Sequence, residues 1–151
     1  MSEANIAIAN RWFNEVWNQR RTATITEIFA PNGISHGAAV DGSDLRGPAS
    51  FLVLYESLIA AFPDMKLTVE DAIAQDDKVL IRWTATMRHT GDVLGIAATN
   101  KPVAFGGMTL VKMANGKFIE AWDHWDKLGM LQQLGVVPAL PASANAKSAN
   151  G

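Results

Sequence analysis

The feature that most constrains the fold is a two-residue alternation of apolar and polar side chains across residues 78–89. Alternate side chains of a strand point to opposite faces of a sheet, so this period predicts a strand rather than a helix. One face is largely polar and consists of Leu80, Arg82, Thr84, Thr86 and Arg88. The other face is almost wholly apolar and consists of Val79, Ile81, Trp83, Ala85, Met87 and His89.

The same period continues on both sides of this stretch, which predicts a meander of neighbouring strands. Asp76-Asp77 and Asn115-Gly116 fall between extended segments, and Asn-Gly is typical of a tight hairpin turn. A short strand is predicted over residues 34–36. The other predicted strands are residues 65–74, 102–113 and 118–125, with a connecting loop over residues 91–101.

The residues before this meander follow the helical period instead. Gly47-Pro48 favours a helix start, because proline is tolerated in the first turn, and Pro63 ends that helix. The predicted helices are residues 4–18, residues 24–29 with Thr24 or Thr26 as cap, residues 47–62, and residues 127–134 with Asp126 as cap.

Helices that precede a meander of antiparallel strands predict the α+β class. We expect a curved antiparallel sheet wrapped by the N-terminal helices into a cone, and the interior of such a cone is an internal pocket. The 151 residues suffice for one domain, which we assign to residues 1–136. Residues 137–151, rich in Ala, Pro, Ser and Asn, are expected to form a flexible tail.

Composition narrows the possible partners. The formal net charge of −2 and the absence of a basic patch give no support for nucleic-acid binding. The chain has no Cys, so thiolate chemistry and Cys-based metal sites are excluded. No apolar run approaches the roughly 20 residues of a membrane helix, and the N-terminus does not resemble a signal peptide. We therefore expect a cytoplasmic protein without a membrane partner.

Residues 116–135 carry the strongest chemical signal. In this segment Asp123 stands in a predicted strand between Trp122 and Trp125, and it shares its face with Trp125. A carboxylate walled by Trp is a candidate acid/base group, because desolvation raises its pKa. Asp126 is better explained as the cap of the following helix, where its carboxylate can accept free backbone N–H groups.

Four segments together resemble the SnoaL-like polyketide cyclases, which belong to the nuclear-transport-factor-2-like superfold. The resemblance spans about residues 5–135, and this superfold hosts several unrelated activities. The segments are RWFNEVWNQ, IFAPNGISHG, LIAAFPDMKLTVEDAIAQDDKVLIRWTATMRHTGDVLGI and GKFIEAWDHWDKLGMLQQLG.

The resemblance implies a small-molecule enzyme, a lyase or isomerase that closes a ring of a polyketide ester by an intramolecular aldol reaction. It implies that an Asp on the last long strand is the acid/base group and that no metal or cofactor takes part. The matching residue is Asp123. The implied partner is a hydrophobic small-molecule substrate.

Two histidines are further candidates. Period two would turn His36 inward together with Ile34, and the related ketosteroid isomerases place a basic carboxylate at the position of His36. His89 matches a histidine common at the end of its strand in the family. Either imidazole could orient the substrate or stabilise an enolate, whereas their spacing with Asp123 is not that of a metal motif. The expected pocket wall consists of Trp83, Trp125, Tyr55, Phe62, Met87 and Phe105.

Two alternatives stay open: a non-catalytic protein that binds a hydrophobic small molecule in the same cone, and an isomerase or hydrolase on the same scaffold. The related limonene-epoxide hydrolases carry Arg and Asp at two inward strand positions, where this chain has Trp83 and Ala85. This departure argues against their mechanism.

Apolar side chains on the outer face of the sheet predict a homodimer, and the resemblance points to the same assembly. The residues expected on that face are Leu80, Leu110, and Met108 or Val111.

Overall fold

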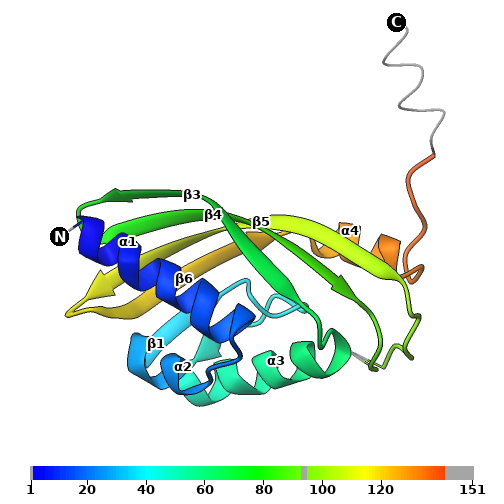
Figure 1. Ribbon diagram of the computed structural model, residues 1–151, viewed down its shortest axis with the longest axis horizontal. Helices are drawn as coiled ribbons and strands as arrows, with labels where there is room; N and C mark the ends of the chain where they lie inside the picture. Colours follow the sequence, from blue (N-terminus) through cyan, green and yellow to red (C-terminus); the bar gives the residue numbers. More distant parts are fainter. Residues whose placement is uncertain (1, 93–94, 142–151) are drawn as a thin grey trace, which may run out of the picture.

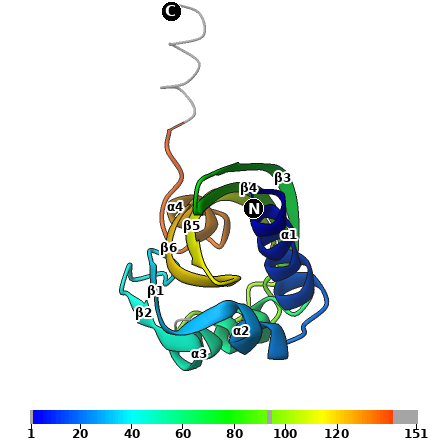
Figure 2. The ribbon, with the colours of Figure 1, turned by 90° about the vertical axis from the view of Figure 1, so that its left-hand side faces the viewer.

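The computed structural model describes residues 2–92 and 95–141. Its centre is a six-stranded sheet in the order β2-β1-β6-β5-β4-β3. Neighbouring strands are antiparallel except β1 and β6, which run parallel. The strands are β1 (Phe29–His36), β2 (Leu45–Arg46), β3 (Lys66–Gln75), β4 (Lys78–Arg88), β5 (Pro102–Ala114) and β6 (Lys117–Trp125). Figure 1 labels all of them except β2, which Figure 2 labels.

The helices cover the concave side of this sheet. Figure 2 looks along the molecule and shows the sheet curling from β3 round to β2, with α1, α2 and α3 closing the open side. The helical segments are α1 (Ser2–Arg11), the π-helix η1 (Trp12–Asn18), α2 (Ala23–Ile28), α3 (Gly47–Ala61) and α4 (Lys127–Gln133). The predicted α+β cone is confirmed.

The alternation read from the sequence is present in β4. Its predicted apolar face is buried from Val79 to Met87, and His89, just beyond the strand, is fully buried. Asn115 and Gly116 both have positive φ, as the two-residue hairpin turn between β5 and β6 requires. Local patterns therefore predicted this meander correctly.

The N-terminal segment departs from expectation in its second half. The predicted helix over residues 4–18 begins as α1 and continues as the π-helix η1. In η1 the Gln19 N–H donates to the carbonyl of Asn14, five residues earlier, at 2.9 Å. Trp12 and Trp17, five residues apart, are both buried. Such π-helical turns are frequent at functional sites.

The start of α2 also differs from the prediction. The N-cap position is Thr22, which makes no capping hydrogen bond through its side chain. Thr24 is fully buried inside the helix, and its hydroxyl donates to Glu15 at 3.1 Å. The expected caps Thr24 and Thr26 were therefore wrong, because tertiary contacts replace the local cap.

The strand predicted over residues 34–36 is longer, and its faces are reversed. β1 begins at Phe29 and pairs with β6 through an irregular register between Phe29 and Ile34. Ser35 is the buried residue near its end, whereas Ile34 and His36 are half-buried. The buried face of β1 is set by its pairing with β6, and the local sequence does not reveal which face this is.

None of the helices in the described part of the chain has the length and apolar character needed to cross a bilayer. The tail expected over residues 137–151 lies mostly outside the described residues, as does the part of the 91–101 loop at residues 93–94.

Candidate functional site

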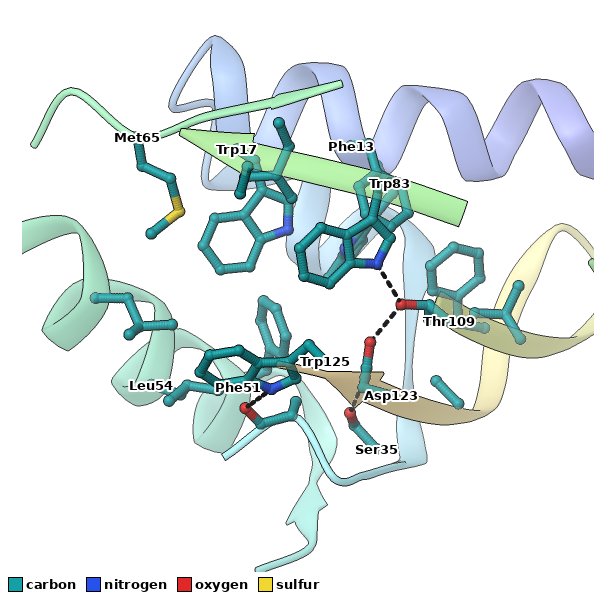
Figure 3. A pocket seen from close by; sticks show the side chains of 18 of the residues that line it. Phe13, Trp17, Ser35, Phe51, Leu54, Met65, Trp83, Thr109, Asp123 and Trp125 are labelled. Atoms are coloured by element: carbon teal, nitrogen blue, oxygen red, sulfur yellow. Dashed lines mark hydrogen bonds between the residues drawn. The ribbon is translucent and has the colours of Figure 1, made fainter. Parts of the chain in front are cut away.

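A deep apolar pocket lies between the concave face of the sheet and the helices η1 and α3 (Figure 3). Its empty space, including the mouth that opens to solvent, is about 830 Å³. Only three of its lining residues carry a hydroxyl or carboxyl group: Ser35, Thr109 and Asp123. The apolar wall is supplied mainly by aromatic side chains, among them Trp12, Phe13, Trp17, Phe29, Phe51, Phe62, Trp83, Phe105, Phe118 and Trp125.

Asp123 is the one acidic residue of this wall. It lies on β6 directly opposite Thr109 of β5. The residue is half-buried, because the pocket itself reaches the carboxyl group, yet protein atoms surround that group and remove most of its hydration. Burial raises the pKa of Asp123 and outweighs the hydrogen bonds that act in the opposite direction.

Two hydroxyl groups hold the Asp123 carboxylate. Thr109 Oγ1 donates to Oδ1 at 2.5 Å, and Ser35 Oγ donates to Oδ2 at 3.3 Å. The indole N–H of Trp83 in turn donates to Thr109 Oγ1 at 3.0 Å. Both hydroxyl bonds favour the ionised carboxylate and lower its pKa, which partly offsets the effect of burial. Figure 3 shows these groups converging on the same end of the pocket.

Two glycines allow the backbone and the Trp side chains to approach this closely. Gly37 has a φ of +80°, and a Cβ there would lie 2.3 Å from the Asp123 carbonyl oxygen. A Cβ on Gly107 would lie 2.6 Å from Cζ2 of Trp83 and 2.7 Å from Cβ of Trp125. A side chain at either position would therefore displace β1 or the pocket wall.

The predicted wall residues separate into two groups. Trp83, Trp125, Phe62 and Phe105 line the pocket as expected. The Trp125 indole N–H donates to the Ala38 carbonyl at 3.1 Å, which ties the loop after β1 to the pocket.

Tyr55 and Met87 are not among the lining residues, so their prediction as pocket wall was wrong. The Tyr55 hydroxyl donates to the Val16 carbonyl at 2.9 Å, and its ring packs 5.2 Å from that of Trp17, centroid to centroid. Met87 is buried in the core near the end of β4. Both lie on the apolar face of their element, as pocket residues do. Position on that face does not distinguish a core residue from one that lines the pocket.

His36 lies outside the pocket, so the expected inward orientation was wrong. Its Nδ1 lies 2.8 Å from Asp44 Oδ1 and its Nε2 lies 2.7 Å from Glu120 Oε2. The ring stacks on Trp122, on the opposite face of β6 from Asp123. The two carboxylates raise the pKa of His36, with the larger effect from Glu120. This arrangement joins β1, the loop before β2, and β6.

His89 is fully buried but does not line the pocket either. Its Nδ1 accepts a hydrogen bond from the Thr99 backbone N–H at 3.1 Å, and its ring packs against Phe62 at 5.3 Å. No described residue provides a partner for Nε2. The structure therefore brings neither predicted histidine next to Asp123.

The partners that the structure does bring to Asp123 are Ser35 and Thr109, which the sequence reasoning missed. Thr109 carried a detectable signal, because it is the single hydroxyl residue on an inward face otherwise formed by Val103, Phe105, Gly107, Val111 and Met113. Ser35 carried no such signal, since its orientation depends on the pairing of β1 with β6, which is distant in the sequence. Within residues 2–92 and 95–141, no three His, Asp or Glu side chains are placed to hold a metal ion.

Solved structures share this architecture. AclR from Streptomyces galilaeus, a suggested hydroxylase, superimposes with a TM-score of 0.85 over 99% of this chain and 92% of its own, at 24% identity. An NTF2-like protein of unknown function from Burkholderia pseudomallei superimposes with a TM-score of 0.74 over 87% of this chain and 97% of its own, at 12% identity. At such identities the likeness shows the NTF2-like fold alone.

Sequence relatives are more informative. The aklanonic acid methyl ester cyclase DauD of Streptomyces sp. (strain C5) is 26% identical over 123 residues, which cover 80% of this chain and 76% of DauD. The family model of the SnoaL-like polyketide cyclases matches residues 7–134, which include every residue of the pocket described above. The chain therefore belongs to the SnoaL-like polyketide cyclase family.

Proposed function

We propose that this protein is a cofactor-independent cyclase that closes a ring of a hydrophobic polyketide ester by an intramolecular aldol reaction. The observation that carries the proposal is a single carboxylate, Asp123, held by two hydroxyl groups in an otherwise apolar pocket. Its distant relative DauD is an aklanonic acid methyl ester cyclase, which supports this class of substrate. Asp123 is the proposed acid/base residue.

In the proposed reaction, the Asp123 carboxylate first removes a proton from a carbon next to a carbonyl group of the substrate. The C–H electron pair becomes an enolate, whose carbon then attacks a second carbonyl carbon of the same molecule and forms the new C–C bond. The second carbonyl oxygen becomes an alkoxide and takes the proton back from Asp123. Protons and electrons balance without an oxidant, a reductant or a metal ion.

The pocket supports this chemistry in two ways. Burial raises the pKa of Asp123 toward the working pH, which makes its carboxylate a stronger base than an exposed Asp. The aromatic walls also exclude water and restrict the conformations of a flexible chain, so that the reacting carbons stay near one another.

The direct test is Asp123→Asn, assayed with aklanonic acid methyl ester as the probe substrate. Asparagine keeps the size of the side chain and can still accept the Thr109 hydroxyl hydrogen, but it is not a base. We expect turnover to fall by about 10²–10⁴-fold, the usual contribution of a positioned acid/base group. Circular dichroism and thermal melting would confirm an intact fold, and wild-type turnover by a folded variant would refute the assignment.

Four Trp residues line the pocket, which also suits a protein that only binds an apolar ligand. The two functions differ in a measurable way. A binder would show saturable quenching of Trp fluorescence by apolar polyketides but would release each of them unchanged. An isomerase would exchange the α-proton of the substrate with solvent deuterium without forming a ring, so product analysis separates all three activities.

A further inference from the structure

The hydrogen bonds around Asp123 have a direction, which distinguishes its two oxygens. The Trp83 indole nitrogen can only donate, so Thr109 Oγ1 must accept in their 3.0 Å contact. The ionised carboxylate can only accept, so the Thr109 hydroxyl hydrogen is committed to Oδ1 of Asp123 at 2.5 Å. The donor and the acceptor are therefore fixed for both hydrogen bonds, the one from Trp83 to Thr109 and the one from Thr109 to Asp123.

Burial makes the arrangement persistent. Trp83 is 7% exposed and Thr109 6% exposed, so water has little access to either partner. The Trp83 ring is also held by neighbours, with Phe13 at 6.3 Å and Phe105 at 6.1 Å between ring centroids. Hydrogen bonds that polarise one another in a low-dielectric surrounding strengthen cooperatively.

The other carboxylate oxygen is held less firmly. Ser35 Oγ lies 3.3 Å from Oδ2, beyond the usual range of 2.5–3.0 Å for O–H···O bonds. Ser35 has no other side-chain hydrogen bond among the described residues, so its hydroxyl can rotate toward a substrate oxygen. Oδ2 is thus the oxygen with a replaceable partner.

We propose that Trp83 is a positioning residue that acts through Thr109. It keeps Oδ1 of Asp123 hydrogen-bonded to the Thr109 hydroxyl, which leaves Oδ2 as the oxygen that exchanges a proton with the substrate. The role of Oδ2 rests on the proposed function, whereas the Trp83-Thr109-Asp123 relay can be measured without any turnover. The relay favours the ionised form, so its removal raises the pKa of Asp123 further.

The central experiment is an NMR titration of the Asp123 carboxyl carbon in the uniformly labelled protein. Trp83→Phe and Thr109→Val should each raise the pKa of Asp123 above the wild-type value. Thr109→Ser keeps both hydrogen bonds and should leave this pKa close to wild type. Trp125→Phe is the matched control, because it removes an indole N–H from the same pocket whose partner is the Ala38 carbonyl. The pKa of Asp123 should be unchanged in this control.

A double mutant separates the relay from simple packing. If Trp83 acts through Thr109, Trp83→Phe should have no additional effect on the pKa of Asp123 once Thr109→Val is present. An equal effect of Trp83→Phe in both backgrounds would mean that the ring acts by desolvation, and this would overturn the relay. An unchanged pKa in the folded Trp83→Phe single mutant would overturn it as well.

Thr109→Val alone provides a second readout if Trp83→Phe does not fold. The Trp83 indole N–H loses its acceptor in this variant, so its proton resonance should move upfield and its exchange with deuterium should accelerate. An indole resonance at the wild-type position would contradict the relay.

If Asp123→Asn retains turnover, the proposed function fails while these NMR outcomes still decide the relay. If the relay fails while Asp123→Asn is inactive, the proposed function stands.

The relay also predicts a change in the pH dependence of kcat/KM. In Trp83→Phe and Thr109→Val, the acidic limb of the kcat/KM profile should move to higher pH together with the measured pKa of Asp123. Thr109→Ser should restore the wild-type limb. A limb that stays in place while the pKa of Asp123 moves would show that this carboxylate is not the titrating base.

Discussion

At the scale of single residues, the pocket keeps an acidic group where solvation is poor. Burial raises the pKa of Asp123 in the folded state above its value in the unfolded chain. The folded state therefore binds a proton more tightly than the unfolded state does. Between the two pKa values the stability falls as the pH rises, and it stays lowered at every higher pH.

Asp123→Asn should consequently raise the melting temperature at neutral pH, because it removes this cost. The gain should disappear well below the ordinary Asp pKa, where both states of the wild type are protonated. Calorimetry at the two pH values measures the difference. Asp77→Asn, at an exposed turn between β3 and β4, is the control for removal of a carboxylate outside the pocket. A melting temperature of Asp123→Asn at or below wild type at neutral pH would contradict the expectation.

At the scale of elements, α4 begins at a side-chain cap. Asp126 accepts a hydrogen bond from the Gly129 backbone N–H at 2.8 Å, which confirms the cap predicted from the sequence. Met130 of α4 is 1% exposed and lines the pocket. The cap therefore connects the start of a short helix to the shape of the substrate site.

Asp126→Ala should destabilise the protein by about 1 kcal/mol, the usual value for a lost N-cap. We also expect KM to rise more than kcat falls, because the change loosens one wall without touching Asp123. Asp126→Asn still offers an acceptor and should stay close to wild type in both stability and KM. Chemical denaturation measures the stability, and steady-state kinetics the KM, of wild type, Asp126→Ala and Asp126→Asn. Equal stability and KM in the two variants would exclude a capping role.

The helices and strands differ in how well the local sequence predicts them. β4 is flanked by sequence neighbours in the sheet, so its own alternation determines which side chains are buried. β1 instead pairs with β6, which is distant in the sequence, and this pairing places Ser35 rather than His36 on the inward face. The π-helical turn of η1 is likewise invisible to a pattern search, because an α-helix with the same residues would also have an apolar side.

At the scale of the whole molecule, the outer face of the sheet carries a row of apolar side chains. Paired positions across β3 to β6 bring together Ile73, Leu80, Leu110 and Trp122. Ile73 is 64% exposed, and Met108 on β5 is 48% exposed. Val111, the predicted alternative to Met108, is buried instead, so Met108 is the outward residue. This row is the surface through which we expect the homodimer to form.

Met108→Glu should convert the expected dimer into a monomer, because it places a charge within the apolar face. Val53→Glu changes an equally apolar residue, 70% exposed on α3, and should leave the dimer intact. Sedimentation equilibrium at micromolar concentration measures the mass of each protein. A monomeric wild type, or dissociation by both variants, would contradict the proposed interface.

The sequence by itself determined the meander, the inward face of β4, the cap of α4 and the presence of Asp123 beside Trp125. Each of these depends on neighbours only a few positions away, and hydrophobic periodicity and capping chemistry report on that range. The resemblance predicted the family.

Only the tertiary structure decided which groups surround Asp123. Ser35 is 88 positions away in the chain and reaches the carboxylate because β1 lies parallel to β6. Thr109 and Trp83 meet it because β4, β5 and β6 pair in one particular register. His36, expected in the pocket, lies on the other face for the same reason. Registers between distant strands follow from the packing of the whole sheet against its helices, and no local pattern contains them.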